Sequence, residues 1–185
     1  VVGYSLPSYL VGIVFIYLFA VKLQIFPVGG AKTPGSTYTG FTEFADRMYY
    51  MALPILVLVF IGLAGMTRTV RAAKIGTLTQ DYIRTARAKG LKEKVVIYSH
   101  AWRNALLPVS TSIMGWIISV FTGGSLVIET TFALNGTGRL YWQALNNTDY
   151  ELVLAMQMFY TVVSLVGVLL TDLSYGLVDP RVRVN

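Results

Sequence analysis

The sequence predicts an all-α integral membrane protein, and three observations support this fold class. Of the 185 residues, 55% are hydrophobic and only 13% are charged, whereas soluble domains carry about 25% charged residues. The apolar residues are gathered into blocks long enough to supply the roughly 20 residues with which a helix crosses a hydrocarbon core of about 30 Å. Charged residues fall between these blocks, and their balance differs from one connection to the next, as in chains oriented by a membrane.

Four membrane spans are expected from the apolar blocks. The first carries Lys22 near one end, where its ammonium can reach the headgroups, and the last carries Asp172 about two turns from its end. No ionisable residue lies near the middle of a span, although ion-coupled carriers usually need such residues. The expected spans are Leu6–Phe26, Met48–Met66, Ala105–Ile128 and Leu152–Val178.

The basic residues are concentrated in the connection between the second and third spans, residues 67–104. The connections 27–47 and 129–151 contain acids that balance or outnumber their basic residues. Because cytoplasmic loops carry the excess of lysine and arginine, we expect residues 67–104 and the C-terminal tail, with Arg181 and Arg183, to be cytoplasmic. A nucleic-acid-binding patch is the alternative explanation for the arginines, but it would not follow the sidedness of the spans.

Several kinds of site are disfavoured by composition. Cysteine is absent, so neither a disulfide framework nor a thiolate metal site can form. His100 is the only histidine, which makes a histidine-based metal site equally unexpected. The sequence never places Gly-Lys before Ser or Thr, as a phosphate-binding loop requires. We therefore expect no catalytic residue, metal or cofactor in this chain, and any ATP that drives it would be hydrolysed by another chain.

The segment Asp81–Pro108 is the most informative part of the sequence. Thr79 or Asp81 is expected to cap a short helix running to Lys89, and Gly90 to end that helix in the left-handed conformation. A second helix is expected to follow, with large apolar residues on one face: Leu91, Val95, Tyr98 and Trp102. From this pattern alone, the two short helices suit a docking surface for another protein and an interfacial helix on anionic lipid equally well.

The third span carries a stripe of small or hydroxylated residues on one face: Thr111, Gly115, Ser119 and Thr122. The opposite side is mostly bulky, as at Ile113, Trp116, Ile117 and Val120. Such a stripe is typical of a solute pathway and also of close packing between helices, and we keep both interpretations.

Three shorter patterns receive simpler interpretations. The run from Thr122 to Ser125 is superficially like a channel filter, but small residues in a membrane helix usually serve packing. The run from Asn135 to Gly138 is expected to be a turn in an external connection. Asp179 and Pro180 are expected to end the last helix, since the residue before a proline avoids the helical conformation.

Two runs, Tyr82–Leu91 (YIRTARAKGL) and His100–Pro108 (HAWRNALLP), are matched by a known family. They closely resemble the cytoplasmic "EAA" loop of bacterial ABC importer permeases, in the dipeptide, oligopeptide and nickel branch. The resemblance covers nearly the whole chain, with further matches at Leu6–Tyr9, Ile128–Phe132, Gly136–Arg139 and Asp179–Arg183. Two residues depart from the broad pattern, since Arg84 stands at the general family's glutamate and Asn135 where many relatives have proline.

The resemblance implies the transmembrane domain of a type I ABC importer, with residues 1–185 as one domain holding the last four helices of a six-helix core. It implies a bacterial inner-membrane location and import of peptides, with nickel or another small solute as the alternative. The implied partners are a homologous second permease, two cytoplasmic ATPases that bind ATP and magnesium, and an extracytoplasmic substrate-binding protein. An ion-coupled carrier and a non-transporting scaffold are the rival functions.

The resemblance also implies which residues dock on the ATPases. They belong to the coupling loop within residues 81–108 and are Arg84, Thr85, Ala86, Ala88, Lys89, Gly90, Leu91, Val95, Tyr98 and Trp102.

Overall fold

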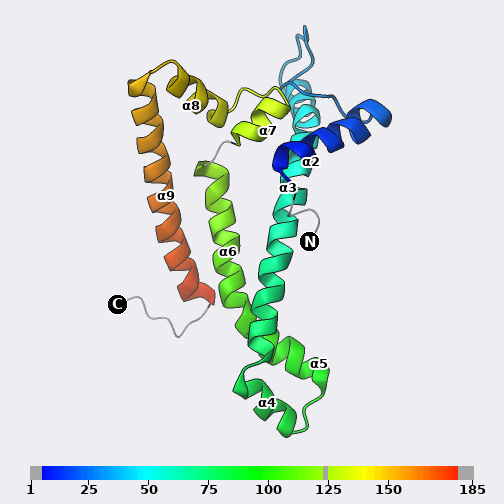
Figure 1. The fold of residues 1–185 in the computed structure, drawn as a ribbon, viewed down its shortest axis with the longest axis vertical. Helices are drawn as coiled ribbons and strands as arrows, with labels where there is room; N and C mark the ends of the chain where they lie inside the picture. Colours follow the sequence, from blue (N-terminus) through cyan, green and yellow to red (C-terminus); the bar gives the residue numbers. More distant parts are fainter. Residues whose placement is uncertain (1–5, 123–124, 179–185) are drawn as a thin grey trace. The chain divides into compact units, whose positions relative to one another are not determined.

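The computed structural model describes residues 6–122 and 125–178, with the backbone alone for residues 103, 107, 108, 120–122 and 174–178. Within these ranges the chain is helical and contains no strand (Figure 1). The expectations for Gly123 and Gly124, for the helix end at Asp179–Pro180 and for the arginines of the tail lie outside the described residues. The helices are α2 (Ser8–Phe15), η1 (Ile16–Lys22), α3 (Phe41–Leu78), α4 (Asp81–Ala88), α5 (Glu93–Val95), η2 (Val96–Ala101), α6 (Trp102–Thr122), α7 (Leu126–Thr131), α8 (Thr137–Asn146) and α9 (Tyr150–Val178).

Among the described residues, two helices are long and apolar enough to cross a bilayer, α3 and Tyr150–Leu173 of α9. They confirm the second and fourth predicted spans as apolar helices of membrane length. The helix at the first predicted span covers Ser8–Lys22, about 22 Å at 1.5 Å per residue, which is shorter than a hydrocarbon core of about 30 Å. The predicted span Leu6–Phe26 is therefore in the right place, but it is longer than the helix in the structure.

The third predicted span, Ala105–Ile128, is not one helix. Helix α6 ends at Thr122, and α7 begins at Leu126 after Ser125. Ser125 is the N-cap of α7, and its hydroxyl accepts a hydrogen bond from the backbone N–H of Ile128 at 3.4 Å. The prediction was wrong because it joined the apolar residues on both sides of the run TGGS, in which Ser125 favours the start of a new helix.

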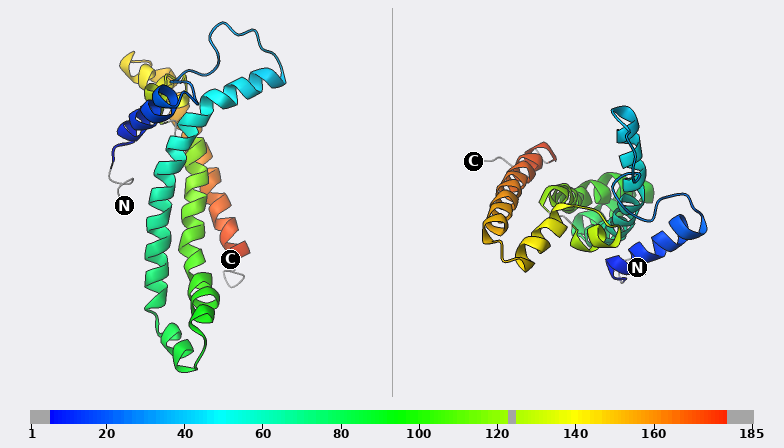
Figure 2. Two further views of the ribbon diagram at one scale, coloured as in Figure 1. Left: turned by 90° about the vertical axis from the view of Figure 1, so that its right-hand side faces the viewer. Right: turned by 90° about the horizontal axis from the view of Figure 1, so that it is seen from above.

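Helix α3 extends well beyond its apolar part. It begins at Phe41, so Glu43, Asp46 and Arg47 lie in its first turns and not in the loop predicted over 27–47. Its N-terminal half bends (Figure 2), and Pro54 stands inside this part of the helix. Proline lacks the N–H that would bond four residues back and its ring crowds that carbonyl, which accounts for the bend.

The helices form two compact units, and each is described separately. The first unit contains residues 6–64 and 125–158 of the described chain. Its core joins α2, α3 and α7 through buried apolar side chains: Val11, Leu53, Val57, Ile128, Phe132 and Leu134.

The connection after η1 packs on this core, because the N–H of Gly30 donates to the carbonyl of Phe132 at 2.8 Å. The same connection is fixed to α3 by Asp46, which accepts from the Thr33 N–H at 2.8 Å and from its hydroxyl at 2.6 Å.

Helices α7 and α8 of the first unit each end with a left-handed residue that is not glycine. Ala133 follows α7 with φ 52°, and Thr148 follows α8 with φ 53°. After α8, the N–H of Asp149 donates to the Ala144 carbonyl at 2.9 Å and that of Thr148 to the Leu145 carbonyl at 3.2 Å. These are the two bonds of a Schellman motif, and equivalent bonds end α7.

The second unit contains residues 65–122 and 159–178 of the described chain. Here Gly167 of α9 lies against Ile118 of α6, and a Cβ at Gly167 would come within 2.6 to 2.9 Å of three Ile118 side-chain atoms. Glycine therefore allows the two helices to approach closely, as small residues do in membrane helix pairs. A second, smaller apolar cluster in this unit belongs to the connection between α3 and α6.

We expect Gly167→Leu to destabilise the protein by about 1–3 kcal/mol, because a side chain there overpacks the contact with the stiff, branched Ile118. Gly76→Ala is the matched control, since a Cβ at that helical glycine would meet no atom within 4 Å. Thermal unfolding in detergent measures both variants. Equal melting temperatures for Gly167→Leu and the unmodified protein would contradict the close contact.

Candidate functional site: the helical tip between α3 and α6

The basic connection folds into a small helical unit at the end where α3 stops and α6 starts (Figures 1 and 2). We call residues 79–101, with α4, α5 and η2, the tip. Its first helix, α4, has Gln80 as N-cap, with no side-chain capping bond. The predicted caps were therefore wrong: the Thr79 hydroxyl donates back to the Gly76 carbonyl at 2.9 Å, and Asp81 lies in the first turn. Asp81 still places negative charge at the positive end of the helix dipole.

Gly90 ends α4 as predicted. Its φ is 73°, in the left-handed region where a side chain is strained, and a Cβ would meet nothing within 4 Å. The N–H of Gly90 donates to the Arg87 carbonyl at 2.9 Å and that of Leu91 to the Ala86 carbonyl at 3.4 Å. These bonds form a Schellman motif with Lys89 as C-cap. Backbone conformation therefore favours glycine at this corner, although no neighbouring atom would block a side chain.

The tip has a core of its own made from small and branched side chains. Ile83, Ala86, Val96 and Ala101 are 0–5% exposed, and Leu78 packs against them. Ala86 was assigned to the docking surface, but its methyl group faces this core. A larger residue at Ala86 would therefore disrupt the packing of the tip before it changed any surface.

The four residues of the predicted apolar face are all exposed. Leu91, Val95, Tyr98 and Trp102 are 36–64% exposed, so the tip's own core does not use them. They do not share one helix. Leu91 precedes the N-cap Lys92, and Trp102 is the first residue of α6. Between them the chain is α-helical over Glu93–Val95 and π-helical over Val96–Ala101, which the sequence did not reveal. Short π-helical turns are frequent at functional sites.

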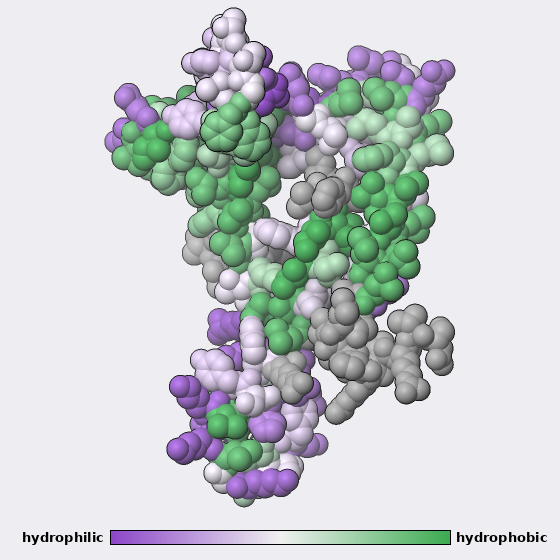
Figure 3. Space-filling view, turned by 180° about the vertical axis from the view of Figure 1, so that it is seen from behind, coloured by the Kyte–Doolittle hydropathy of each residue, from purple (hydrophilic) through white to green (hydrophobic). Residues whose placement is uncertain are grey.

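The remaining predicted docking residues lie on the outer surface of α4 and its corner. Arg84, Thr85, Ala88 and Lys89 are exposed, together with Gly90. Thr85 uses its hydroxyl within the helix, donating to the Asp81 carbonyl at 3.0 Å. Hydrophilic and hydrophobic residues therefore lie side by side on the surface of the tip (Figure 3).

An ion pair closes the corner at Gly90. The Arg87 guanidinium binds both carboxylate oxygens of Glu93, with Nη2 at 2.7 Å and Nε at 3.2 Å. The hydrogen bond from Arg87, with its positive charge, holds the pKa of the Glu93 carboxyl below its usual value of 4.5. Because two parallel bonds fix the relative orientation of the two groups, this pair restrains α4 against α5.

The predicted pathway stripe lies on α6. Thr111, Gly115 and Ser119 are exposed, and the Ser119 hydroxyl donates to the Trp116 carbonyl at 2.7 Å. Thr122 is the last residue of α6, and its side chain lies outside the described part. Bulky residues of the other side, Ile113 and Trp116, are exposed as well. The pathway therefore stays a prediction.

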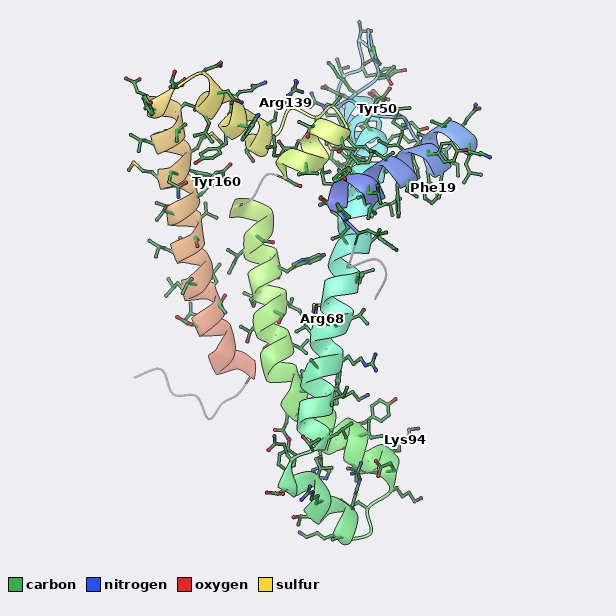
Figure 4. The ribbon with its side chains drawn as sticks, viewed as in Figure 1. Phe19, Tyr50, Arg68, Lys94, Arg139 and Tyr160 are labelled. Carbon is green, nitrogen blue, oxygen red and sulfur yellow. The ribbon has the colours of Figure 1, made fainter. Side chains whose placement is uncertain are left out.

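Sequence reasoning missed a buried carboxylate that organises the connection between α7 and α8. Glu129 is 9% exposed, and its oxygens accept hydrogen bonds from the N–H groups of Arg139 at 2.6 Å and Gly138 at 3.3 Å. Arg139, labelled in Figure 4, also donates from its side chain to the Asn135 amide oxygen at 3.1 Å. A Cβ at Gly136 would overlap the Glu129 carboxylate. The predicted turn over 135–138 is thus the start of α8, capped by a distant acid.

The fold and the tip together define a class: a helical membrane protein whose basic connection forms an ordered, projecting tip. Residues 1–184 match the family described as binding-protein-dependent transport system inner membrane component, and the chain belongs to this family. It is 41% identical over 98% of its length to the oligopeptide transport system permease protein AppB of Bacillus subtilis (strain 168), covering 56% of that protein.

Two further relatives carry dipeptide names. The dipeptide transport system permease protein DppB of Bacillus subtilis (strain 168) is 36% identical over 100% of this chain and 55% of its own length. DppB of Escherichia coli (strain K12) is 36% identical over 98% of this chain and 58% of its own length. The chain therefore spans little more than half the length of these relatives.

We expect the corner at Gly90 to loosen in acid. Since the folded protein lowers the pKa of Glu93, the ion pair stabilises the tip above the carboxyl's ordinary pKa, and this contribution is lost as the pH falls through the lowered value. An NMR titration of the Glu93 side-chain carboxyl should give a pKa below 4.5, and Arg87→Gln should return it upward. Lys92→Gln is the control, and a Glu93 pKa unaffected by Arg87→Gln would contradict the pairing.

Proposed function

We propose that this chain is part of the permease subunit of an ATP-driven importer of dipeptides and oligopeptides. The observation that carries the proposal is the tip: a small ordered unit with a left-handed glycine corner and an exposed apolar face, at the end of a helix of membrane length. Membership of a family of transport-system inner membrane components supports it. In this proposal the chain performs no chemistry and turns nucleotide-driven movements of other chains into movements of its helices.

We place residues 67–104 and the C-terminus in the cytoplasm, where the basic excess of the connection is expected. There the apolar face of Leu91, Val95, Tyr98 and Trp102 and the outer surface of α4 would dock on a cytoplasmic ATPase. An exposed apolar patch with a polar rim is typical of a protein–protein interface. An ordered tip is suited to coupling because a movement of the ATPase would displace α3 and α6 instead of deforming the connection.

The proposed assembly contains a homologous second permease, two ATPases that hydrolyse ATP with magnesium, and an extracytoplasmic substrate-binding protein. Peptides are the favoured substrates because the relatives at 41% and 36% identity are named as oligopeptide and dipeptide permeases. Import of nickel or another small solute is the second candidate, from the branch that the sequence resembles. Small and hydroxylated side chains on α6 would suit peptides, since they leave room and bind peptide groups without a fixed charge.

A substitution at Gly90 tests whether the tip couples ATP hydrolysis to uptake. Gly90→Val should reduce substrate-stimulated ATP hydrolysis and uptake, because a β-branched residue costs roughly 1 kcal/mol or more in the left-handed conformation and misdirects the second helix. Gly90→Asn is the matched control, since asparagine accepts this conformation more readily. Both variants are measured as complete complexes in proteoliposomes. Normal uptake and stimulation with valine would refute the docking role of the corner.

Cysteine labelling tests the pathway, because the chain has no cysteine of its own. Single cysteines at Thr111, Gly115, Ser119 and Thr122 should react with a water-soluble thiol reagent at rates that change with ATP and binding protein. Cysteines at Ile113 and Trp116, on the bulky side, serve as controls and should stay unreactive. If none of the four stripe positions reacts in any state, the stripe serves helix packing instead.

A further inference from the structure

A second group of basic residues lies where α3 leaves its apolar part. Arg71 and Lys74 stand five and eight residues beyond Met66, the last residue of the apolar run. At 1.5 Å per residue they lie about 8 and 12 Å further along the helix axis. Lipid headgroups extend roughly 5–8 Å outside each side of the hydrocarbon core. Both residues therefore start within or just beyond the headgroup layer of a membrane that α3 crosses.

The direction of their side chains brings the charges back toward that layer. In an α-helix the Cα–Cβ bonds tilt toward the helix N-terminus, and along α3 that direction leads from Lys74 back to Met66. Long basic side chains also extend their apolar stems to reach the interface. This direction lets the charges of Arg71 and Lys74 reach back toward the headgroups.

The positive charges of Arg71, Lys74 and Lys94 are not neutralised by a carboxylate among the described residues. The two acids of the tip are already paired, Asp81 with Arg84 at 3.7 Å and Glu93 with Arg87 at 2.7 Å. Among the described residues, no carboxylate lies within ion-pair distance of Arg71, Lys74 or Lys94. A concentrated positive charge without its own counterion attracts an external anion.

An aromatic ring connects the basic residues of α3 to the second helix of the tip. The Lys74 ammonium lies 5.9 Å from the ring centroid of Tyr98, a cation–π distance. Tyr98 is 64% exposed. Lys94 lies in α5, four residues before Tyr98; its place on the tip is labelled in Figure 4. Tyrosine is enriched at headgroup level, where its ring and its hydroxyl meet different surroundings.

We propose that Arg71, Lys74, Lys94 and Tyr98 form a binding site for the phosphate headgroup of an anionic phospholipid. The guanidinium and the two ammonium groups donate to the phosphate oxygens, and the ring of Tyr98 keeps the Lys74 ammonium in place. The site would hold the base of the tip at the membrane surface. It takes Tyr98 from the proposed docking face and leaves Leu91, Val95, Trp102 and the outer surface of α4 available to an ATPase. The inference requires that α3 crosses the membrane, and it is independent of the direction of transport and of the solute.

The test compares lipid selectivity in the complete transporter complex, reconstituted in nanodiscs of phosphatidylcholine with a minority of phosphatidylglycerol. Spin-labelled phosphatidylglycerol, measured against spin-labelled phosphatidylcholine by electron paramagnetic resonance, reports the selectivity. Nanodiscs expose both membrane faces, so the result does not depend on which side the tip occupies. A basic residue near an anionic surface contributes about 1 kcal/mol, or roughly fivefold in binding.

We expect Arg71→Gln with Lys74→Gln to reduce the preference for phosphatidylglycerol at least several-fold. The charge-matched control, Lys32→Gln with Lys92→Gln, should keep the preference, because Lys32 lies outside the second unit and Lys92 outside the proposed site. The exchange Arg71→Lys with Lys74→Arg keeps both charges and should also keep the preference. It shows whether a loss in the glutamine variant comes from charge or from misfolding.

Unchanged selectivity in the glutamine variant would overturn the proposal, and so would an equal loss in the charge-matched control. Release of the ATPases by the glutamine variant, with lipid selectivity intact, would assign Arg71 and Lys74 to a protein contact instead. Failure of the proposed transport function would appear separately, as uptake that does not need ATP, and would leave the lipid result standing.

Discussion

Hydrocarbon offers no hydrogen-bonding partner to a backbone and almost no solvation to a charge, and the arrangement of this chain follows from that constraint. Long apolar helices satisfy their own backbone groups, as α3 and α9 do. Charged and irregular segments are then confined to the ends of the helices. The tip must therefore fold as a small polar unit, with four buried side chains of modest size as its core.

So small a core cannot fix the direction of two helices by apolar burial alone. In the tip, three weaker restraints act together: a Schellman motif at Gly90, the paired hydrogen bonds between Arg87 and Glu93, and the packing of Val96 on Ile83 and Ala86. They leave the large residues Tyr98 and Trp102 directed outward. The core of the tip is thus built from its smaller apolar residues, and its large residues remain exposed. This arrangement suits the proposed docking role.

Features that depend on local chemistry could be predicted from the sequence. Gly90 was recognised because glycine is the usual residue for a left-handed corner, and two spans were recognised by the length of their apolar runs. The equivalent corners at Ala133 and Thr148 were not, since neither residue type signals a left-handed conformation. Ala86 was assigned to the docking surface through the family resemblance, and its residue type did not contradict this because a small apolar residue suits either side of a helix. The capping role of Glu129 was missed because the N–H groups that it binds lie nine and ten residues further along the sequence. Only the fold of the connection between α7 and α8 brings them to the carboxylate.

Ala133 and Thr148 also bear on how freely this part of the family can vary. A side chain in the left-handed conformation costs roughly 1 kcal/mol, and the smaller freedom of the unfolded chain offsets only part of this cost. Alanine and threonine at these corners are therefore strained relative to glycine and are held there by the hydrogen bonds of the two Schellman motifs. The path of the backbone is therefore kept by hydrogen bonds that every residue except proline can make. The side chains of Ala133 and Thr148 thus add surface chemistry at two places where the backbone hydrogen bonds keep the shape of the unit.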